Sequence, residues 1–339
     1  MPSRKTSTLR TLEVFRLIHA PRLQVRPETG ILGTMNSSAL KIAVVGSGAV
    51  GGYYGGLLAH AGEDVHFLMR ADLETVRTHG LTIHTHGETI TLPKVSCSAT
   101  AEEIGPVDFV VIALKTTANP ALETIIPPLL KPETTLITLQ NGLGNEEFLS
   151  TRWGIQRVIG GLCFVCLNRT APGVIDHFDA GSLSIGEFQR PVSERVTTLV
   201  DAFIRAGINA RAVENLITER WRKLLWNIPF NGLGIAGHGA TVADVLANDG
   251  LRKVARDLMD EILDAARRLG HEIGDEVADH HIDRSYALKR YRTSSMIDWE
   301  EGRPVETEAI WGEPWRQGVA AGALMPRTEM LYQLIRQAT

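Results

Sequence analysis

The sequence predicts an α/β domain followed by an all-α domain, and three observations support this prediction. Short apolar runs typical of buried strands alternate with helical stretches as far as residue 213. A glycine-rich turn follows the first of these runs, at residues 46–51. From Leu216 onward the apolar residues recur mostly at helical spacing. We therefore expect one domain over residues 40–214 and a helical domain over residues 215–339, with the boundary near Glu214.

Composition narrows the class of protein. The chain has 339 residues, 44% of them hydrophobic, which suits one or two domains with a sizeable core. It has no apolar run of about 18 residues, the length that a membrane span needs. Its net charge of −4 gives no support for a nucleic-acid partner. The three cysteines make a poor disulfide framework and suit a reducing cytosol, so we expect a cytoplasmic protein.

The first 34 residues differ from the rest of the chain. They carry six Lys or Arg and two Glu among scattered Leu, Ile and Val. A targeting segment can have this composition, but the apolar core of a secretory signal is missing. Because Met35 stands just ahead of the first predicted strand, we favour an appended or mis-started extension over residues 1–39, poorly ordered.

The glycine-rich turn predicts a dinucleotide site. Residues 42–45 form a short apolar strand, and Gly46, Gly48 and Gly51 complete the pattern G-x-G-x-x-G ahead of a helical stretch that Gly62 ends. The glycines allow a tight turn, close approach to a pyrophosphate and close helix packing, while free N–H groups at the helix start face phosphate. This pattern is typical of a Rossmann domain. The predicted contacts are Gly46, Ser47, Gly48, Ala49, Val50 and Gly51.

The end of the second strand indicates which dinucleotide binds. The predicted strand covers residues 64–69, and Arg70 follows it, 19 residues beyond Gly51. A site specific for NAD would carry an Asp or Glu here, for the ribose 2′-hydroxyl. A guanidinium instead binds a 2′-phosphate through charge-assisted bonds, although Arg70 could also be a solvated strand-end residue. We therefore expect NADP(H) as the cofactor.

Polar residues follow two further buried strands, predicted at residues 108–114 and 134–139. Lys115 follows the first of them, and Asn141 lies just beyond the second. The carboxyl ends of parallel strands face the crevice where ligands bind, so both are candidate cofactor or substrate contacts. Ordinary turn chemistry would equally explain Asn141, which precedes a glycine. Further strands are expected at residues 158–168, 182–188 and 208–213, a hairpin at 81–92 and a helix at 194–206.

Two patterns resemble metal or redox sites, but we assign neither role. His84 and His86 lie in the predicted hairpin without a cluster of further ligands, so no metal site is expected. Cys163 and Cys166 match C-x-x-C inside an apolar strand pattern, and not at a helix N-terminus where a reactive pair would lie. We interpret both as buried cysteines.

A polar stripe runs along the predicted buried helix at residues 221–235. Lys223, Asn227 and Asn231 recur at every fourth residue and therefore share one face, and Pro229 should kink the helix. Buried groups of this kind need partners, which either a substrate or a core hydrogen-bond network would supply. Carbonyl reduction would explain the stripe. Hydride addition to a 2-oxo acid builds negative charge on oxygen, which a lysine ammonium stabilises and protonates.

Taken together, these motifs resemble the ketopantoate reductase (2-dehydropantoate 2-reductase) family from residue 41 to the C-terminus. The marks are the glycine turn, Leu114-Lys115, Asn141-Gly142-Leu143-Gly144, Trp221 to Lys223 with Asn227 and Asn231, Thr293 to Met296, and Gly302 to Glu306. The resemblance implies a Rossmann domain followed by a helical domain, with NADPH and a small 2-oxo acid bound between the two domains. It implies Lys223 as general acid, Glu306 as the substrate-orienting carboxylate, Asn141 beside the nicotinamide, and Asn227, Asn231 and Ser295 as substrate contacts.

The chain departs from the family pattern around the expected substrate pocket. Gly232 and Gly234 follow Asn231 where Pro and then Ser or Thr are usual, and Trp311 replaces a smaller polar residue. The interval from Ser295 to Gly302 is one residue shorter than is usual in the family. Glu308 is therefore the alternative to Glu306 as the site carboxylate. A reductase of another branched 2-oxo acid and a non-catalytic NADPH sensor are the alternative functions. A homodimer is compatible with the sequence.

Overall fold

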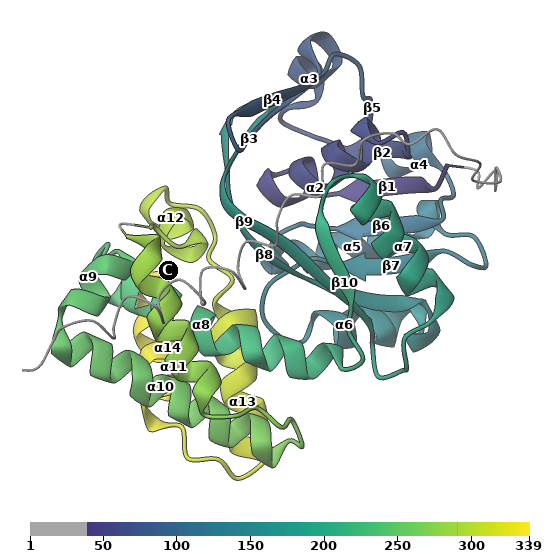
Figure 1. Ribbon diagram of the computed structural model, residues 1–339. Coiled ribbons are helices and arrows are strands. Elements are labelled where there is room, and N and C mark those ends of the chain that lie inside the picture. Colours follow the sequence, from purple (N-terminus) through teal and green to yellow (C-terminus); the bar gives the residue numbers. More distant parts are fainter. Residues whose placement is uncertain (1–38, 290) are drawn as a thin grey trace, which may run out of the picture. The chain divides into compact units, whose positions relative to one another are not determined.

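The computed structural model describes residues 39–289 and 291–339 (Figure 1). The extension predicted over residues 1–39 lies outside the described residues as far as residue 38. Two kinds of structure follow each other along the described chain. Strands and helices alternate from β1 to β10, and from α8 onward every element is helical.

A ten-stranded mixed sheet forms the first part of the described chain, with β10 paired to β9 and the other strands in the order β4-β3-β9-β8-β7-β6-β1-β2-β5. The central strands β8, β7, β6, β1 and β2 pair in parallel, as the alternation of apolar runs and helices predicts. The strands are β1 (Lys41–Val45), β2 (Asp64–Leu68), β3 (Leu81–Thr85), β4 (Glu88–Leu92), β5 (Ser96–Ser98), β6 (Phe109–Ile112), β7 (Thr135–Thr138), β8 (Val158–Ala171), β9 (Val174–Glu187) and β10 (Asn209–Ala212).

Helices cover both faces of this sheet, which explains why its central strands are apolar without alternation. Ile42 and Val44 of β1 belong to one apolar cluster, whereas Ala43 and Val45 belong to another on the opposite face. The helices α2 and α7 contribute to the first cluster, and α4, α5 and α6 to the second. These helices are α2 (Ala49–His60), α3 (Leu73–His79), α4 (Ala101–Ile104), α5 (Leu122–Ile125), α6 (Asn145–Trp153) and α7 (Glu194–Arg205).

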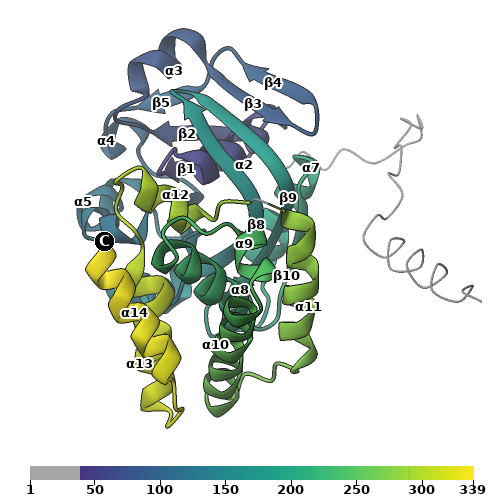
Figure 2. The ribbon, with the colours of Figure 1, turned by 90° about the vertical axis from the view of Figure 1, so that its left-hand side faces the viewer.

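The antiparallel ribbon of β8 and β9 is the largest difference from the predicted strands. The turn at Pro172-Gly173 is where the sequence places it, with Gly173 at φ +70°. However, β9 begins at Val174 and not at residue 182. The segment before Ser182 resembles a turn, but it is an irregularity within the ladder, where Ala180 takes φ +61°. The ribbon packs along α2 and pairs with β3 (Figure 2).

The helical part of the chain is built around α8 (Leu216–Ala236), which packs against α10, α11, α12 and α14. Asn215 caps its first turn by accepting the backbone N–H of Thr218 at 3.0 Å. The helix runs on through Pro229. The remaining helices are α9 (Val242–Ala247), α10 (Asp249–Arg268), α11 (Glu276–Ser285), α12 (Ser294–Glu300), α13 (Glu313–Ala320) and α14 (Pro326–Ala338). Within the described ranges, no helix is long and apolar enough to cross a membrane.

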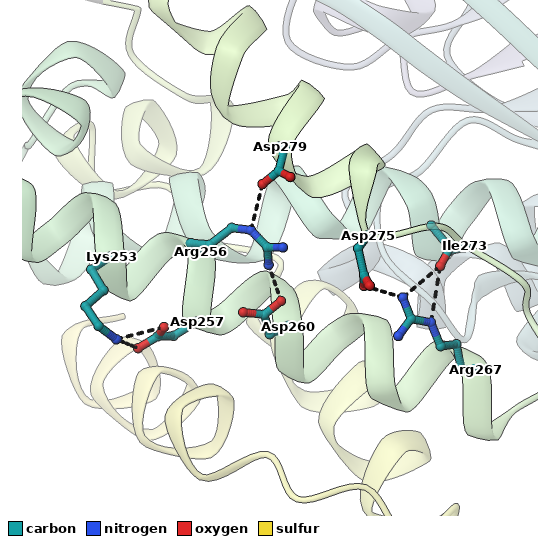
Figure 3. A network of polar contacts seen from close by, with 8 residues as sticks. All are labelled: Lys253, Arg256, Asp257, Asp260, Arg267, Ile273, Asp275 and Asp279. Carbon is teal, nitrogen blue, oxygen red and sulfur yellow. Dashed lines mark hydrogen bonds and ion pairs between the residues drawn. The ribbon is translucent and has the colours of Figure 1, made fainter.

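Surface ion pairs line α10 and join it to α11 and the loop before it (Figure 3). Arg256 contacts Asp260 on its own helix and donates to Asp279 of α11 at 3.1 Å. Arg267 contacts Asp275 and donates to the carbonyl of Ile273. Because these groups are largely exposed, each pair is worth only about 0–1 kcal/mol. The apolar core below them, and not this network, stabilises the helical domain.

Candidate active site

The glycine turn has the shape that a dinucleotide needs. Gly46 has φ +101°, and a Cβ there would lie 2.4 Å from the backbone nitrogen of Leu114. A Cβ on Gly51 would lie 2.2 Å from the carbonyl oxygen of Gly46. A Cβ on Gly48 would meet nothing within 4 Å. Packing therefore explains why positions 46 and 51 are glycines. The space beside Gly48 is open for a pyrophosphate, and it lies next to the start of α2, where no side chain of the described residues caps the backbone N–H groups.

The adjacent strand end carries Arg70 as an exposed side chain. The hydroxyl of Ser47 donates to the carbonyl oxygen of Leu68 at 3.0 Å, which ties the glycine turn to the end of β2. Among the described residues, the Arg70 guanidinium has no hydrogen bond or ion pair. It is therefore available to an anion at this edge of the sheet.

Asn141 lies at the edge reached by β7, and its backbone is held from two sides. Asn145 donates to its carbonyl oxygen at 3.0 Å. The next residue, Gly142, has φ +83°, and a Cβ there would lie 2.1 Å from the carbonyl oxygen of Ala309. Leu143 donates its backbone N–H to the same carbonyl at 2.9 Å. Glycine is thus required at position 142 so that the Asn141 loop can pack against the helical part of the chain.

Lys223 of α8 reaches this loop. Its Nζ donates to Oδ1 of Asn141 at 2.8 Å and to the carbonyl oxygen of Cys163 at 2.8 Å. The Nζ also lies 5.5 Å from the centre of the partly exposed Phe164 ring. The structure thus brings together a lysine and an amide that lie 82 residues apart in the sequence. Both were predicted site residues.

Burial gives this lysine an acidity suited to proton transfer. Desolvation lowers the pKa of Lys223 from 10.5 to about 8, and the positive charge of Arg220 acts in the same direction. Cys163 and Glu306 oppose the shift. The result is an ammonium group that is mostly protonated at pH 7 yet gives up its proton far more readily than an exposed lysine.

A buried ion pair that no sequence pattern indicated supports the loop of Asn141 and the helical turn before Lys223. Arg220 and Glu146 are only 3% and 0% exposed, and Nε of the arginine donates to Oε1 of the glutamate at 2.7 Å. Arg220 also donates to the carbonyl oxygen of Gln140 at 3.0 Å. The Gln140 carbonyl lies one residue before Asn141, and Arg220 lies one helical turn before Lys223. No residue spacing in the sequence indicates the pair of Arg220 and Glu146.

A second group of charges surrounds Lys115, at the end of β6. Its Nζ lies 2.5 Å from Oδ2 of Asp298 and 3.7 Å from Oε2 of Glu306. Burial lowers the pKa of Lys115, but the carboxylates of Glu306 and Asp298 outweigh it and hold that pKa above its ordinary value. Glu306 is 4% exposed and also accepts the backbone N–H of Thr116 at 2.9 Å. Asp298 is a further member of this group that the sequence did not single out.

The structure separates the two candidate carboxylates. Glu306 faces Lys115, and its charge acts on Lys223. Glu308 instead accepts a hydrogen bond from Tyr332 at 2.7 Å and one from Arg316 at 2.9 Å. A π-helical turn over Glu308–Gly312 follows Glu306. Such π-helical turns are rare in proteins, and those that occur are frequently found at functional sites.

The two asparagines of the polar stripe on α8 are buried, and Lys223 is half-buried. Asn227 is 5% exposed and Asn231 is 2% exposed. The amide oxygen of Asn231 accepts the backbone N–H of Ser295 at 3.4 Å, which joins α8 to the start of α12. In the described part of the chain, no hydrogen bond reaches the side chain of Asn227 or the hydroxyl of Ser295. These groups are therefore available to a ligand.

The unusual Gly232 and Trp311 explain each other. A Cβ on Gly232 would lie 2.9 Å from Nε1 of Trp311 and 2.6 Å from Cδ2 of Leu331. The indole is fully buried in the helical core and donates to the carbonyl oxygen of Ile228 at 3.0 Å. The absence of a side chain at position 232 makes room for the large ring. This departure from the family pattern is thus a matched pair within the core.

A doubly covered sheet with parallel central strands and a glycine turn, followed by a helical bundle that carries a lysine to the sheet edge, is the architecture of a dinucleotide-dependent reductase. Two family models match the chain: "Ketopantoate reductase PanE/ApbA" over residues 42–190 and "Ketopantoate reductase PanE/ApbA C terminal" over residues 215–339. The chain belongs to the ketopantoate reductase family and is an oxidoreductase of that family.

Individual relatives agree with this membership. A 2-dehydropantoate 2-reductase of Nostoc sp. is 37% identical over 87% of this chain and 94% of its own length. The crystal structure of a 2-dehydropantoate 2-reductase from Geobacter metallireducens is 44% identical, with a TM-score of 0.87 over 88% of this chain and 100% of that one. One from Methylococcus capsulatus is 33% identical, with a TM-score of 0.81 over 87% of this chain and 96% of that one.

Proposed function

We propose that the protein reduces 2-dehydropantoate to (R)-pantoate with NADPH, and that Lys223 donates the proton. The observation that carries this proposal is the pair of hydrogen bonds from Lys223 Nζ to Asn141 and to the Cys163 carbonyl. They hold an ammonium with a pKa of about 8 at the edge of the sheet where a Rossmann domain binds its dinucleotide. The names of the relatives support the choice of substrate.

Bound NADPH would supply a hydride to the C2 carbonyl carbon of the substrate. We assign its pyrophosphate to the backbone of residues 46–51, its 2′-phosphate to Arg70, and further contacts to Lys115 and Asn141. The open space over Gly48 and the unpaired Arg70 fit these roles. A charge-assisted hydrogen bond from Arg70 would stabilise the phosphate by about 1.5–3 kcal/mol, which corresponds to a preference of roughly 10- to 100-fold.

Lys223 would act on the carbonyl oxygen. As the hydride arrives at carbon, the C–O π electrons move to oxygen, and the Lys223 ammonium stabilises the developing charge. Transfer of one ammonium proton gives the hydroxyl of pantoate and leaves a neutral amine, which water then reprotonates. The amide oxygen of Asn141 and the carbonyl oxygen of Cys163 orient the ammonium without removing its proton. Asn141, at 2.8 Å, is the nearest of the predicted partners.

The remaining polar groups would hold the substrate in register. Asn227 and Asn231 of α8 and Ser295 of α12 are buried and offer amide and hydroxyl groups. We assign Glu306, and not Glu308, as the carboxylate that orients the substrate hydroxyl, because the charge of Glu306 acts on Lys223, whereas Glu308 contacts Tyr332 and Arg316. The negative charge of Glu306 also favours the ammonium form of Lys223.

Several coarser assignments accompany this function. We propose domains over residues 40–214 and 215–339, since the last strand ends at Ala212 and α8 begins at Leu216. We propose a cytoplasmic enzyme in the route to pantothenate and coenzyme A; three cysteines in 339 residues make a poor disulfide framework, which suits a reducing compartment. A homodimer stays a prediction, which sedimentation analysis would test.

A panel of 2-oxo acids tests the proposal. Oxidation of NADPH and of NADH is followed with ketopantoate and with other branched 2-oxo acids, for the wild type and for Arg70→Ala. The proposal predicts that ketopantoate with NADPH has the highest kcat/KM, and that Arg70→Ala weakens NADPH about tenfold or more while sparing NADH. A better substrate of another shape would support the alternative reductase, and no turnover would support a sensor. Equal losses for both cofactors would contradict the role of Arg70.

A further inference from the structure

We propose that Arg169 is a specificity-determining residue for the cofactor: it binds Asp72 and so keeps that carboxylate from opposing the 2′-phosphate of NADPH. This inference rests on the proposed preference for NADPH. It concerns a pair of residues from distant parts of the chain, one at the end of β2 and the other on the β8–β9 ribbon.

Asp72 lies where a carboxylate should disfavour NADPH. It follows Arg70 by two residues and directly precedes α3 (Leu73–His79). Although it occupies the N-cap position of this helix, its side chain makes no capping hydrogen bond. Both of its carboxylate oxygens accept from Nη1 of Arg169, at 2.6 and 2.5 Å. The acidic side chain is thus directed to the ribbon and not to its own helix.

The ribbon carries Arg169 to the nucleotide-binding helix. Arg169 of β8 is opposite Ile175 of β9, and a Cβ on Gly52 of α2 would lie 2.2 Å from Cδ1 of Ile175. Gly52 directly follows the last glycine of the dinucleotide turn. On its other side, β9 pairs with β3, so the ribbon spans from the first turn of α2 to the segment that follows α3 (Figure 2). Arg169 therefore reaches Asp72 across the adenosine end of the predicted site.

The charges decide which cofactor this arrangement favours. A free carboxylate near the end of β2 would attract a ribose hydroxyl and repel a 2′-phosphate, which is how a site specific for NAD is built. The ion pair of Asp72 and Arg169 has no net charge, so it removes the repulsion between the carboxylate and a 2′-phosphate. Within the described part of the chain, Arg70 then remains as a cation without a neighbouring counter-charge. The side chain of Asp72 is 11% exposed and that of Arg169 is 44% exposed, so the arginine shields the carboxylate from the open side.

A double-mutant cycle tests the proposal, using Arg169→Met, Asp72→Asn and the combined variant. Dissociation constants for NADPH and NADH are measured by fluorescence titration, with thermal unfolding as a check on folding. We expect Arg169→Met to weaken NADPH about tenfold, the scale of one charge interaction near a protein surface, and to leave NADH unchanged or tighter. Asp72→Asn should keep the preference for NADPH, and the combined variant should recover it. Arg152→Met, which removes a surface arginine paired with Glu123 at 2.8 Å, is the matched control and should change neither constant.

Two outcomes would overturn the proposal. If Arg169→Met weakens both cofactors equally, the pair only supports the fold of the ribbon. If the combined variant binds NADPH as poorly as Arg169→Met, the freed carboxylate is not the cause of the loss. Both outcomes differ from failure of the proposed function, in which the wild type itself would prefer NADH and Arg70→Ala would not discriminate between the cofactors.

Discussion

Raising the pH should slow the reduction by deprotonating Lys223. Desolvation lowers the pKa of this lysine to about 8, assisted by Arg220 and opposed by Cys163 and Glu306. A shift from 10.5 to about 8 corresponds to roughly 3 kcal/mol of differential stabilisation of the neutral amine. The donor form is therefore present below pH 8 and is lost above it.

The size of the effect follows from this pKa. With a midpoint near pH 8, about nine tenths of the enzyme carries the ammonium at pH 7 and about one tenth at pH 9. The rate limited by proton donation should fall by about tenfold over that interval and then by about tenfold per further pH unit. A lysine with its ordinary pKa would leave the rate flat until about pH 10.

The assay is kcat/KM for ketopantoate with NADPH between pH 6 and 10, since this quantity reports the free enzyme. Lys223→Ala should lower turnover by roughly 10²–10⁴-fold and abolish the alkaline decline, while still binding NADPH. Lys253→Ala, which alters an exposed lysine paired with Asp257 at 2.7 Å, should behave as the wild type. A decline centred near pH 10, or an unchanged profile in Lys223→Ala, would mean that Lys223 is not the proton donor.

Three further predictions concern the site carboxylates, the buried ion pair and the core of the helical domain. Glu306→Gln should lower kcat/KM for ketopantoate by at least about tenfold, and Glu308→Gln should have little effect; the reverse order in steady-state assays would exchange their roles. Arg220→Met should destabilise the protein by about 3–5 kcal/mol in urea unfolding because it leaves Glu146 buried and unpaired, whereas replacing both residues with apolar ones should recover most of that loss. Gly232→Ala should cost about 1–3 kcal/mol in the same assay, through its clashes in the helical core, and an unchanged midpoint would mean that the core adapts.

The elements that define the cofactor site were predictable because their sequence patterns are local. Gly46, Gly48 and Gly51 lie within six residues, and their roles follow from the backbone geometry of one turn. Buried strands and the amphipathic helices between them follow from apolar periodicity. The stripe from Lys223 to Asn231 follows from helix geometry in the same way.

Contacts between distant segments were not predictable. Arg220 and Glu146 lie 74 residues apart, and nothing in either local sequence shows that both are buried. Asp72 and Arg169 lie 97 residues apart, and Arg169 lies near the end of β8, in the ribbon that β8 forms with a β9 longer than its apolar pattern indicates. The irregularity near Ala180 hid that length, because a residue with positive φ inside a ladder resembles a turn in the sequence. Such pairs depend on strand register, which single-sequence patterns do not determine.

The most direct test of the account is a crystal structure of the enzyme with NADP⁺ and pantoate. We expect the 2′-phosphate at Arg70 and the pantoate 2-hydroxyl within about 3 Å of Lys223 Nζ, the reach of a proton transfer. We also expect Asn227 or Ser295 to contact the substrate. Pantoate bound away from Lys223, or a dinucleotide whose ribose lies far from Arg70, would contradict it.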